Sequence, residues 1–217
     1  MSKIKVDNIA TRTGSGNITF DNNVDLTGRT VTGEVVQTAN IAGNAVTSAK
    51  MFSSFKNGVT EVDFWRMTAD TTTADNRSTG IFTNWARADS NTYFGTGMTE
   101  SSGVFTFPSS GIYEIQHFGR FATTGTDARH LGCGMLQSTD SGSNYSNSEH
   151  DDVTGYIYHV TSNTYQTVGF TAIFDVANAT TYRVKFFGRS SDSSGLTVQG
   201  STSTNNTWVK FIRLGDT

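Results

Sequence analysis

The chain has 217 residues and a formal net charge of −3, and only 16 % of its side chains are charged, against about 25 % in a typical globular protein. Its lysines and arginines are scattered, whereas nucleic-acid binding needs a basic stripe. No apolar run reaches the roughly 18 residues that cross a bilayer, and the N-terminus lacks the apolar core of a secretory signal. We therefore expect no nucleic-acid partner, no membrane insertion and no signal peptide.

Residues 1–33 contain short segments of β-type composition, such as 3-KIKVDNI-9 and 17-NITF-20, between Gly, Asn and Asp turn signals. Each segment is too short to bury much apolar surface, while ordering each residue costs roughly 1–2 kcal/mol of backbone entropy. We expect this arm to be ordered only against a docking surface or against identical arms. The composition of this arm therefore favours a protein that works as part of an assembly.

Residues 34–56 form a connector that is rich in alanine and valine. Five apolar residues recur at spacings of four and three, the pattern of a narrow helical seam: Val35, Ala39, Ala42, Val46 and Ala49. The seam is shorter than two heptads and Gly43 lowers its helix propensity, so a helix and an extended stalk both stay open. In either form we expect the connector to lie on a symmetry axis.

From about residue 57, alternating or short apolar runs separated by turn-forming residues predict strands. The ten expected strands cover 62–67, 80–89, 103–107, 111–121, 130–136, 153–160, 165–176, 180–189, 195–200 and 207–215. No segment here has a convincing helical pattern. The sequence therefore predicts an all-β antiparallel sandwich or jelly roll over residues 57–217, with the single cysteine, Cys133, as a buried thiol.

Pro108 is the only proline in the chain, and it stands inside the apolar alternating run 103-GVFTFPSSGIYEI-115. Proline cannot donate to a sheet ladder and is confined to strand edges, strand starts, bulges and corners. We therefore expect two strands with a corner between them.

This run resembles the central motif of C1q/TNF-like domains, in which an apolar strand ends at a proline and Gly-x-Tyr opens the next strand. Other phrases are similar to that family as well: 82-FTNWARAD-89, 170-FTAIFDVANATTYRVKFFG-188 and 207-TWVKFIRL-214. The resemblance covers roughly residues 57–217 and implies a ten-stranded C1q/TNF-like jelly-roll sandwich that forms trimers. The chain has no Gly-X-Y collagen stalk, and residues 1–55 would replace it.

The N-terminal phrases resemble tail-fibre and other virion appendage proteins of tailed bacteriophages, notably marine and cyanobacterial ones. They are 1-MSKIKVDNIATRTGSGNITF-20 and 44-NAVTSAKM-51, ahead of 95-GTGMTESSGVFTFP-108. The resemblance implies a homotrimer on the virion surface, assembled in the host cytoplasm and docked to other virion proteins through residues 1–33. We expect no cofactor.

One compact group of ionisable residues occurs, at 149-EHDDV-153. Alternate residues of an extended chain share a face, so His150 and Asp152 are the candidate pair for a metal ion. The alternative is a solvated acidic loop without a metal.

Tyrosines suggest a second candidate site, because exposed aromatic rings flanked by Asn, Asp and Ser can stack on sugar rings. Tyr145 lies in the polar segment 138-STDSGSNYSNSEH-150, and Tyr156 and Tyr158 follow it. They are candidates for contact with a host glycan, or alternatively for packing at a strand edge. The tryptophans Trp65, Trp85 and Trp208 lie in alternating strands and are expected in the core or at the trimer interface.

We therefore expect a structural virion protein rather than an enzyme, acting as a fibre or adhesin that contacts a surface glycan or protein of the host. A capsid cement or decoration protein is the main alternative. The enzymatic alternative is a polysaccharide depolymerase, which would need a pair of carboxylates at a fixed separation, and no motif marks such a pair.

Overall fold

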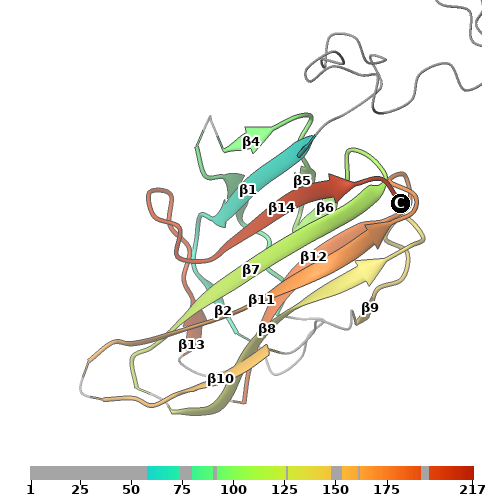
Figure 1. Cartoon of the computed structure of the whole chain (residues 1–217). Coiled ribbons are helices and arrows are strands. Elements are labelled where there is room, and N and C mark those ends of the chain that lie inside the picture. The colour runs from blue at the N-terminus through green and yellow to red at the C-terminus, as the bar shows by residue number, and fades with distance from the viewer. Residues whose placement is uncertain are drawn as a thin grey trace, which may run out of the picture. The chain divides into compact units, whose positions relative to one another are not determined.

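A computed structural model describes residues 58–73, 80–89, 92–125, 127–147, 153–160, 162–191 and 196–217. Within these ranges every regular element is a strand, and the strands form two antiparallel sheets packed as a sandwich (Figure 1). No helix in this part of the chain is long and apolar enough to cross a bilayer. The expected docking arm, the connector with its five seam residues, and the pair His150 and Asp152 lie outside the described residues.

The larger sheet has eight strands: β1 (Glu61–Met67), β2 (Thr71–Thr72), β3 (Trp85–Arg87), β4 (Tyr93–Phe94), β7 (Gly111–Thr123), β11 (Thr164–Val176), β13 (Leu196–Val198) and β14 (Trp208–Gly215). The smaller sheet has six: β5 (Thr99–Ser101), β6 (Val104–Thr106), β8 (Ala128–Ser138), β9 (Ser146–Asn147), β10 (Val153–Ile157) and β12 (Arg183–Ser190). Successive long strands mostly alternate between the sheets, an arrangement compatible with a jelly roll.

The prediction of an all-β sandwich is confirmed, and a strand occurs within each of the ten expected segments. The segment 80–89 is shortened to the three residues of β3, preceded by an isolated bridge between Ile81 and Phe187. The sequence did not indicate β2, β4, β5 and β9, which are two or three residues long. Alternation needs at least four residues to be visible, so such strands leave no pattern to detect.

The core lies between the two sheets and is built mainly by alternation along the long strands, although the residues of β8 from Leu131 to Leu136 are all buried. In β1, for example, Trp65 and Met67 face inward while Phe64 and Arg66 face outward. Trp85 and Cys133 are also buried, which confirms the core position expected for these two tryptophans and for the thiol.

His117 occupies the core face of β7, where it is fully buried. Four aromatic rings lie within 6.1 Å of its imidazole, measured between ring centroids: Phe82, Trp85, Phe170 and Phe186. Its Nδ1 lies 2.9 Å from the Trp208 carbonyl oxygen; a carbonyl only accepts, so Nδ1 carries the proton. Nε2 has no partner among the described residues, and burial lowers the pKa of His117 to about 4.

The corner expected at Pro108 is confirmed, because β6 ends at Thr106 in the smaller sheet and β7 begins at Gly111 in the larger one. The residues between them carry the chain across the sandwich. Gly111 has a φ of 143°, and a Cβ there would lie 2.5 Å from the Gly215 carbonyl oxygen, so no larger residue fits. Tyr113 is buried, and its hydroxyl donates to the Ser109 carbonyl oxygen over 2.9 Å, which fastens the corner.

Tyr113→Phe should therefore lower the free energy of unfolding by about 1 kcal/mol, the usual net value of one intramolecular hydrogen bond. Urea denaturation at a fixed chain concentration measures this change. Tyr182→Phe is the matched control, because the Tyr182 hydroxyl has no hydrogen-bond partner within the described ranges, and its stability should stay unchanged. Equal stabilities for both variants would show that the Tyr113 hydroxyl does not hold the corner.

Candidate interaction surfaces

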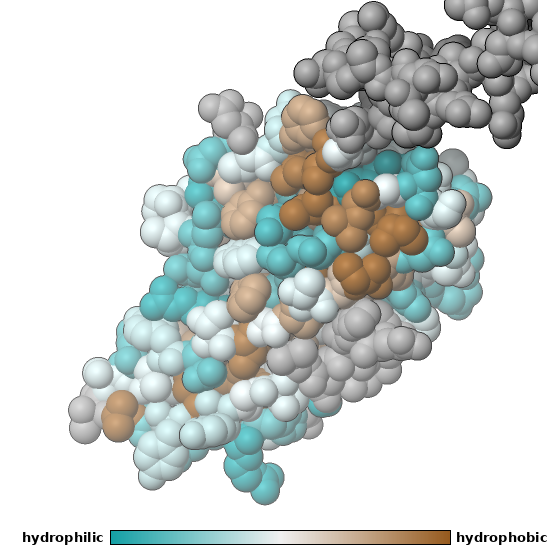
Figure 2. Space-filling view, in the orientation of Figure 1, coloured by the Kyte–Doolittle hydropathy of each residue, from teal (hydrophilic) through white to brown (hydrophobic). Residues whose placement is uncertain are grey.

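The outer face of the larger sheet carries a row of side chains that crosses five strands and is apolar except for Glu114. The strand registers place Phe94, Val62, Ile212, Glu114 and Ile173 side by side on β4, β1, β14, β7 and β11. Phe94 is 61 % exposed and Ile173 57 % exposed, and Leu214 at the end of β14 extends the apolar surface. Figure 2 shows apolar side chains gathered over the part of this face where β1 begins and β14 ends.

A polar band and then an aromatic stack follow this row along the same face. Lys210 and Gln116 lie opposite each other in the polar band. Beyond them Trp208 stacks between Phe64 and Phe118, with ring centroids 5.1 and 4.8 Å away. Trp208 therefore faces outward, unlike the other two tryptophans, and the face combines the aromatic and aliphatic groups that are typical of protein interfaces.

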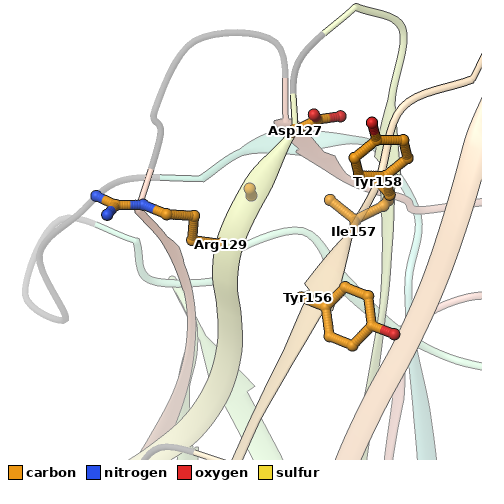
Figure 3. Close-up of a pocket in the computed structure, with 6 residues that line it drawn as sticks. Asp127, Arg129, Tyr156, Ile157 and Tyr158 are labelled. Atoms are coloured by element: carbon orange, nitrogen blue, oxygen red, sulfur yellow. The ribbon is translucent and has the colours of Figure 1, made fainter.

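A second candidate surface lies on the smaller sheet, at its edge strand β10. A hollow of about 320 Å³ there is lined by Asp127, Ala128, Arg129, Tyr156, Ile157 and Tyr158 (Figure 3). Ile157 points into the core, so its neighbours Tyr156 and Tyr158 both point outward, 73 % and 68 % exposed. The backbone N–H of His159 donates to Asp127 Oδ1 over 2.5 Å and joins the two sides of the hollow.

A β-bulge in β8 shapes this hollow. Gly155 pairs with Leu131, and Ile157 pairs with Ala128, so Arg129 and His130 together oppose the single residue Tyr156. The extra residue lets Ala128 and Leu131, three positions apart, both face the core. The bulge therefore turns the start of β8, and Asp127 just before it, relative to the rest of the strand.

Tyr145, the third tyrosine of the predicted glycan site, lies elsewhere. Its neighbour Ser146 pairs with Gln137, whereas Gly155 pairs with Leu131, and these two points are about 20 Å apart along β8. The Lys185 ammonium lies 3.8 Å from the centre of the Tyr145 ring. Burial raises the pKa of Tyr145 and lowers that of Lys185, as expected for a partly desolvated pair. Tyr145 thus packs on β12 and does not share a surface with the other two tyrosines.

The sequence therefore indicated two of the hollow's lining residues and missed Asp127 and Arg129. Some 29 residues separate Asp127 from Tyr156, and only the pairing of β8 with β10 brings them together. Within the described ranges, no group of three or more potential metal ligands occurs. No protein-family model matches the sequence, and none of the curated proteins matches it significantly.

Proposed function

We propose that the chain is a structural protein of a tailed-phage particle, a homotrimer with a C1q/TNF-like jelly-roll domain. Residues 1–33 dock the trimer to other virion proteins, residues 34–56 form the connector on the trimer axis, and the domain projects outward to contact the host surface. The proposal is supported by the resemblance of the sequence to these families, by the jelly-roll-compatible sandwich and by the corner at Pro108.

The observation that carries the proposed assembly is the apolar outer face of the larger sheet. Phe94, Ile173 and Leu214 are about half exposed or more. Phe94 pairs with Val62 and Val62 with Ile212, whereas Glu114 lies between Ile212 and Ile173. An exposed apolar surface of this kind marks an interaction site in a soluble protein. Three copies that cover this face on one another would remove it from water.

Sedimentation velocity at micromolar concentration tests this assembly, and we expect the mass of three chains. Ile173→Asp places a charge on the apolar face without disturbing the core, so it should weaken association on the order of 100-fold or more, as burial of an unpaired charge at an interface does. Val160→Asp is the matched control, because Val160 is 58 % exposed and lies outside this face. A folded wild-type monomer at this concentration would overturn the proposed trimer.

A capsid cement or decoration protein is the second form of this proposal. Such a protein would have the same docking arm and trimeric domain. The copy number per purified particle separates the two: hundreds of chains indicate capsid decoration, and a handful indicates a tail appendage. Failure to find the protein in particles would contradict both forms.

A further inference from the structure

We propose that the hollow beside β10 binds a neutral sugar unit, held on Tyr156 and Tyr158 and hydrogen-bonded by Asp127 (Figure 3). This inference rests on the proposed contact with a host surface and names the chemistry of that contact. It restricts the glycan site to one end of β8 and β10, adds Asp127 to it and removes Tyr145 from it.

The first support is that the side chains of these two tyrosines make no ring, cation or hydroxyl hydrogen-bond contact with other described residues. The chain has seven tyrosines, and the other five each pack on a ring or a cation. Those five are Tyr93 on Arg87, Tyr113 on Phe107, Tyr145 on Lys185, Tyr165 on Arg120 and Tyr182 on Phe174. Tyr156 and Tyr158 show neither a ring contact nor a hydrogen bond of the hydroxyl within the described part of the chain, and they remain 73 % and 68 % exposed.

The second support is the position of the two rings. They flank the buried Ile157 on an extended segment, one on each side of it in the sequence. Residues two apart on an extended chain project from the same side. Aromatic faces offer a flat apolar surface to the C–H groups of a sugar ring, and the tyrosine hydroxyls add donors and acceptors at its edge. Tyr156 lies on β10 and Tyr158 directly follows its last residue, Ile157, so neither ring sits on a long loop, which limits the ordering cost of binding.

The third support is Asp127, which supplies acceptors where a sugar presents donors. Its Oδ1 already accepts the His159 N–H, and this bond fixes the carboxylate at the rim of the hollow. Its Oδ2 has no partner among the described residues and can accept from a sugar hydroxyl as a charge-assisted bond. Figure 3 shows this carboxylate on the same side of the hollow as the Tyr158 ring.

The charges at the hollow select a neutral ligand over an anionic one. The Arg129 guanidinium points away from the tyrosines, so it does not face a ligand that lies on the rings (Figure 3). The Asp127 carboxylate would repel a uronic or sialic acid placed there. Among the described residues that line the hollow, Asp127 is the one carboxylate. A volume of about 320 Å³ stands at the lower end of small-ligand sites and fits a short sugar segment.

Saturation-transfer NMR on the full chain tests the proposal, with methyl α-glucoside, methyl α-mannoside and lactose as neutral probes and glucuronic acid as the anionic comparison. We expect millimolar binding of at least one neutral probe and none of glucuronic acid. Tyr156→Ala and Tyr158→Ala should each weaken binding about fivefold, the effect of losing one aromatic contact. Tyr145→Ala is the matched control and should bind as the wild type does.

Asp127→Asn adds an independent test, because the amide oxygen can still accept the His159 N–H while the charge is lost. It should weaken neutral-sugar binding and remove the discrimination against glucuronic acid. Far-UV circular dichroism of each variant checks that the sandwich is intact. Absence of saturation transfer to every neutral probe, or equal binding of glucuronic acid by the wild type, overturns the proposal.

Sedimentation of the tyrosine variants separates this site from the proposed assembly. If Tyr156→Ala or Tyr158→Ala dissociates the oligomer, the rings pack against a second copy of the chain and the sugar site is wrong. A monomeric wild type that binds the sugar contradicts the trimer and leaves the site standing. A trimer that binds none of the probes contradicts the site and leaves the trimer standing.

Discussion

Arg87→Met should lower the free energy of unfolding by about 3–5 kcal/mol, because it leaves a buried carboxylate without its counter-charge. Asp63 is 2 % exposed on the core face of β1. Its Oδ1 and Oδ2 accept hydrogen bonds from Arg87 Nε and Nη2 over 3.0 and 2.9 Å, and Oδ2 also accepts the Met98 N–H over 2.6 Å. Hydrogen bonding to Asp63 raises the pKa of Arg87, so the guanidinium stays charged.

The reverse substitution, Asp63→Ala, should cost less, about 2 kcal/mol, which is the penalty of an unsatisfied Met98 N–H. The Arg87 side chain is 33 % exposed and lies between the rings of Trp65 and Tyr93, at 4.7 and 4.5 Å, so water and the two rings still stabilise its charge. Adding Arg87→Met to Asp63→Ala should then change little, since the buried charge is gone. Urea denaturation of the three variants measures their free energies of unfolding. Equal losses of stability for the two single variants would contradict this asymmetry.

Acidification from pH 6.5 to pH 4 should destabilise the protein through His117 by about 3 kcal/mol, in addition to the effect of its carboxylates. The pKa of His117 falls from 6.5 to about 4 on folding, and each unit corresponds to about 1.4 kcal/mol. Below pH 6.5 the unfolded chain binds a proton that the folded chain does not, so stability declines as the pH falls through this window. Above it the imidazole is neutral in both states and contributes no pH dependence.

The variant His117→Phe tests whether His117 causes this loss of stability at low pH. At pH 8 the variant should be less stable than the wild type by about 1 kcal/mol, because the bond to the Trp208 carbonyl is lost. At pH 4 it should be the more stable of the two, because a phenyl ring has no proton to exclude. Phe186→Leu is the matched control: it removes a ring of the same cluster, 4.9 Å from the imidazole, and should lower stability equally at both pH values. Urea denaturation at pH 8 and at pH 4 measures the free energies of unfolding. The same order of stability for wild type and His117→Phe at both pH values would contradict the prediction.

Most of the long strands could be predicted from the sequence because they have a polar and an apolar side with a period of two, as β7 and β11 do. The segment around His117 illustrates this: it shares the inward face with Ile115 and Phe121, so its burial follows from alternation alone. Alternation does not decide which of the two faces of a strand lies against the core. Trp208 follows the same pattern as Trp65, yet it lies on the outer face because the register of β14 with β1 and β7 puts it there.

The hollow at β10 could be predicted only in part, because its residues come from two strands. Tyr156 and Tyr158 are visible as an aromatic pair around an inward residue. Asp127 enters through the pairing of β8 with β10 and through the bulge, and neither a bulge position nor a strand register can be read from residue types here. The same register separates Tyr145 from the pair, although it is close to both in sequence.

Because β14 lies in the middle of the larger sheet, the sheet cannot be completed during synthesis until this strand is available. This strand, the last of those described, lies between β1 and β7 and joins them, so the two cannot pair with each other across the larger sheet. Until residue 215 has left the ribosome, β1 and β3 have only each other and β4 as partners in that sheet. The rest of the sheet is built on the pairing of β7 with β11, about fifty residues away along the chain. We therefore expect the sandwich to close only after β14 has left the ribosome, and to close slowly because its contacts are mostly distant in sequence.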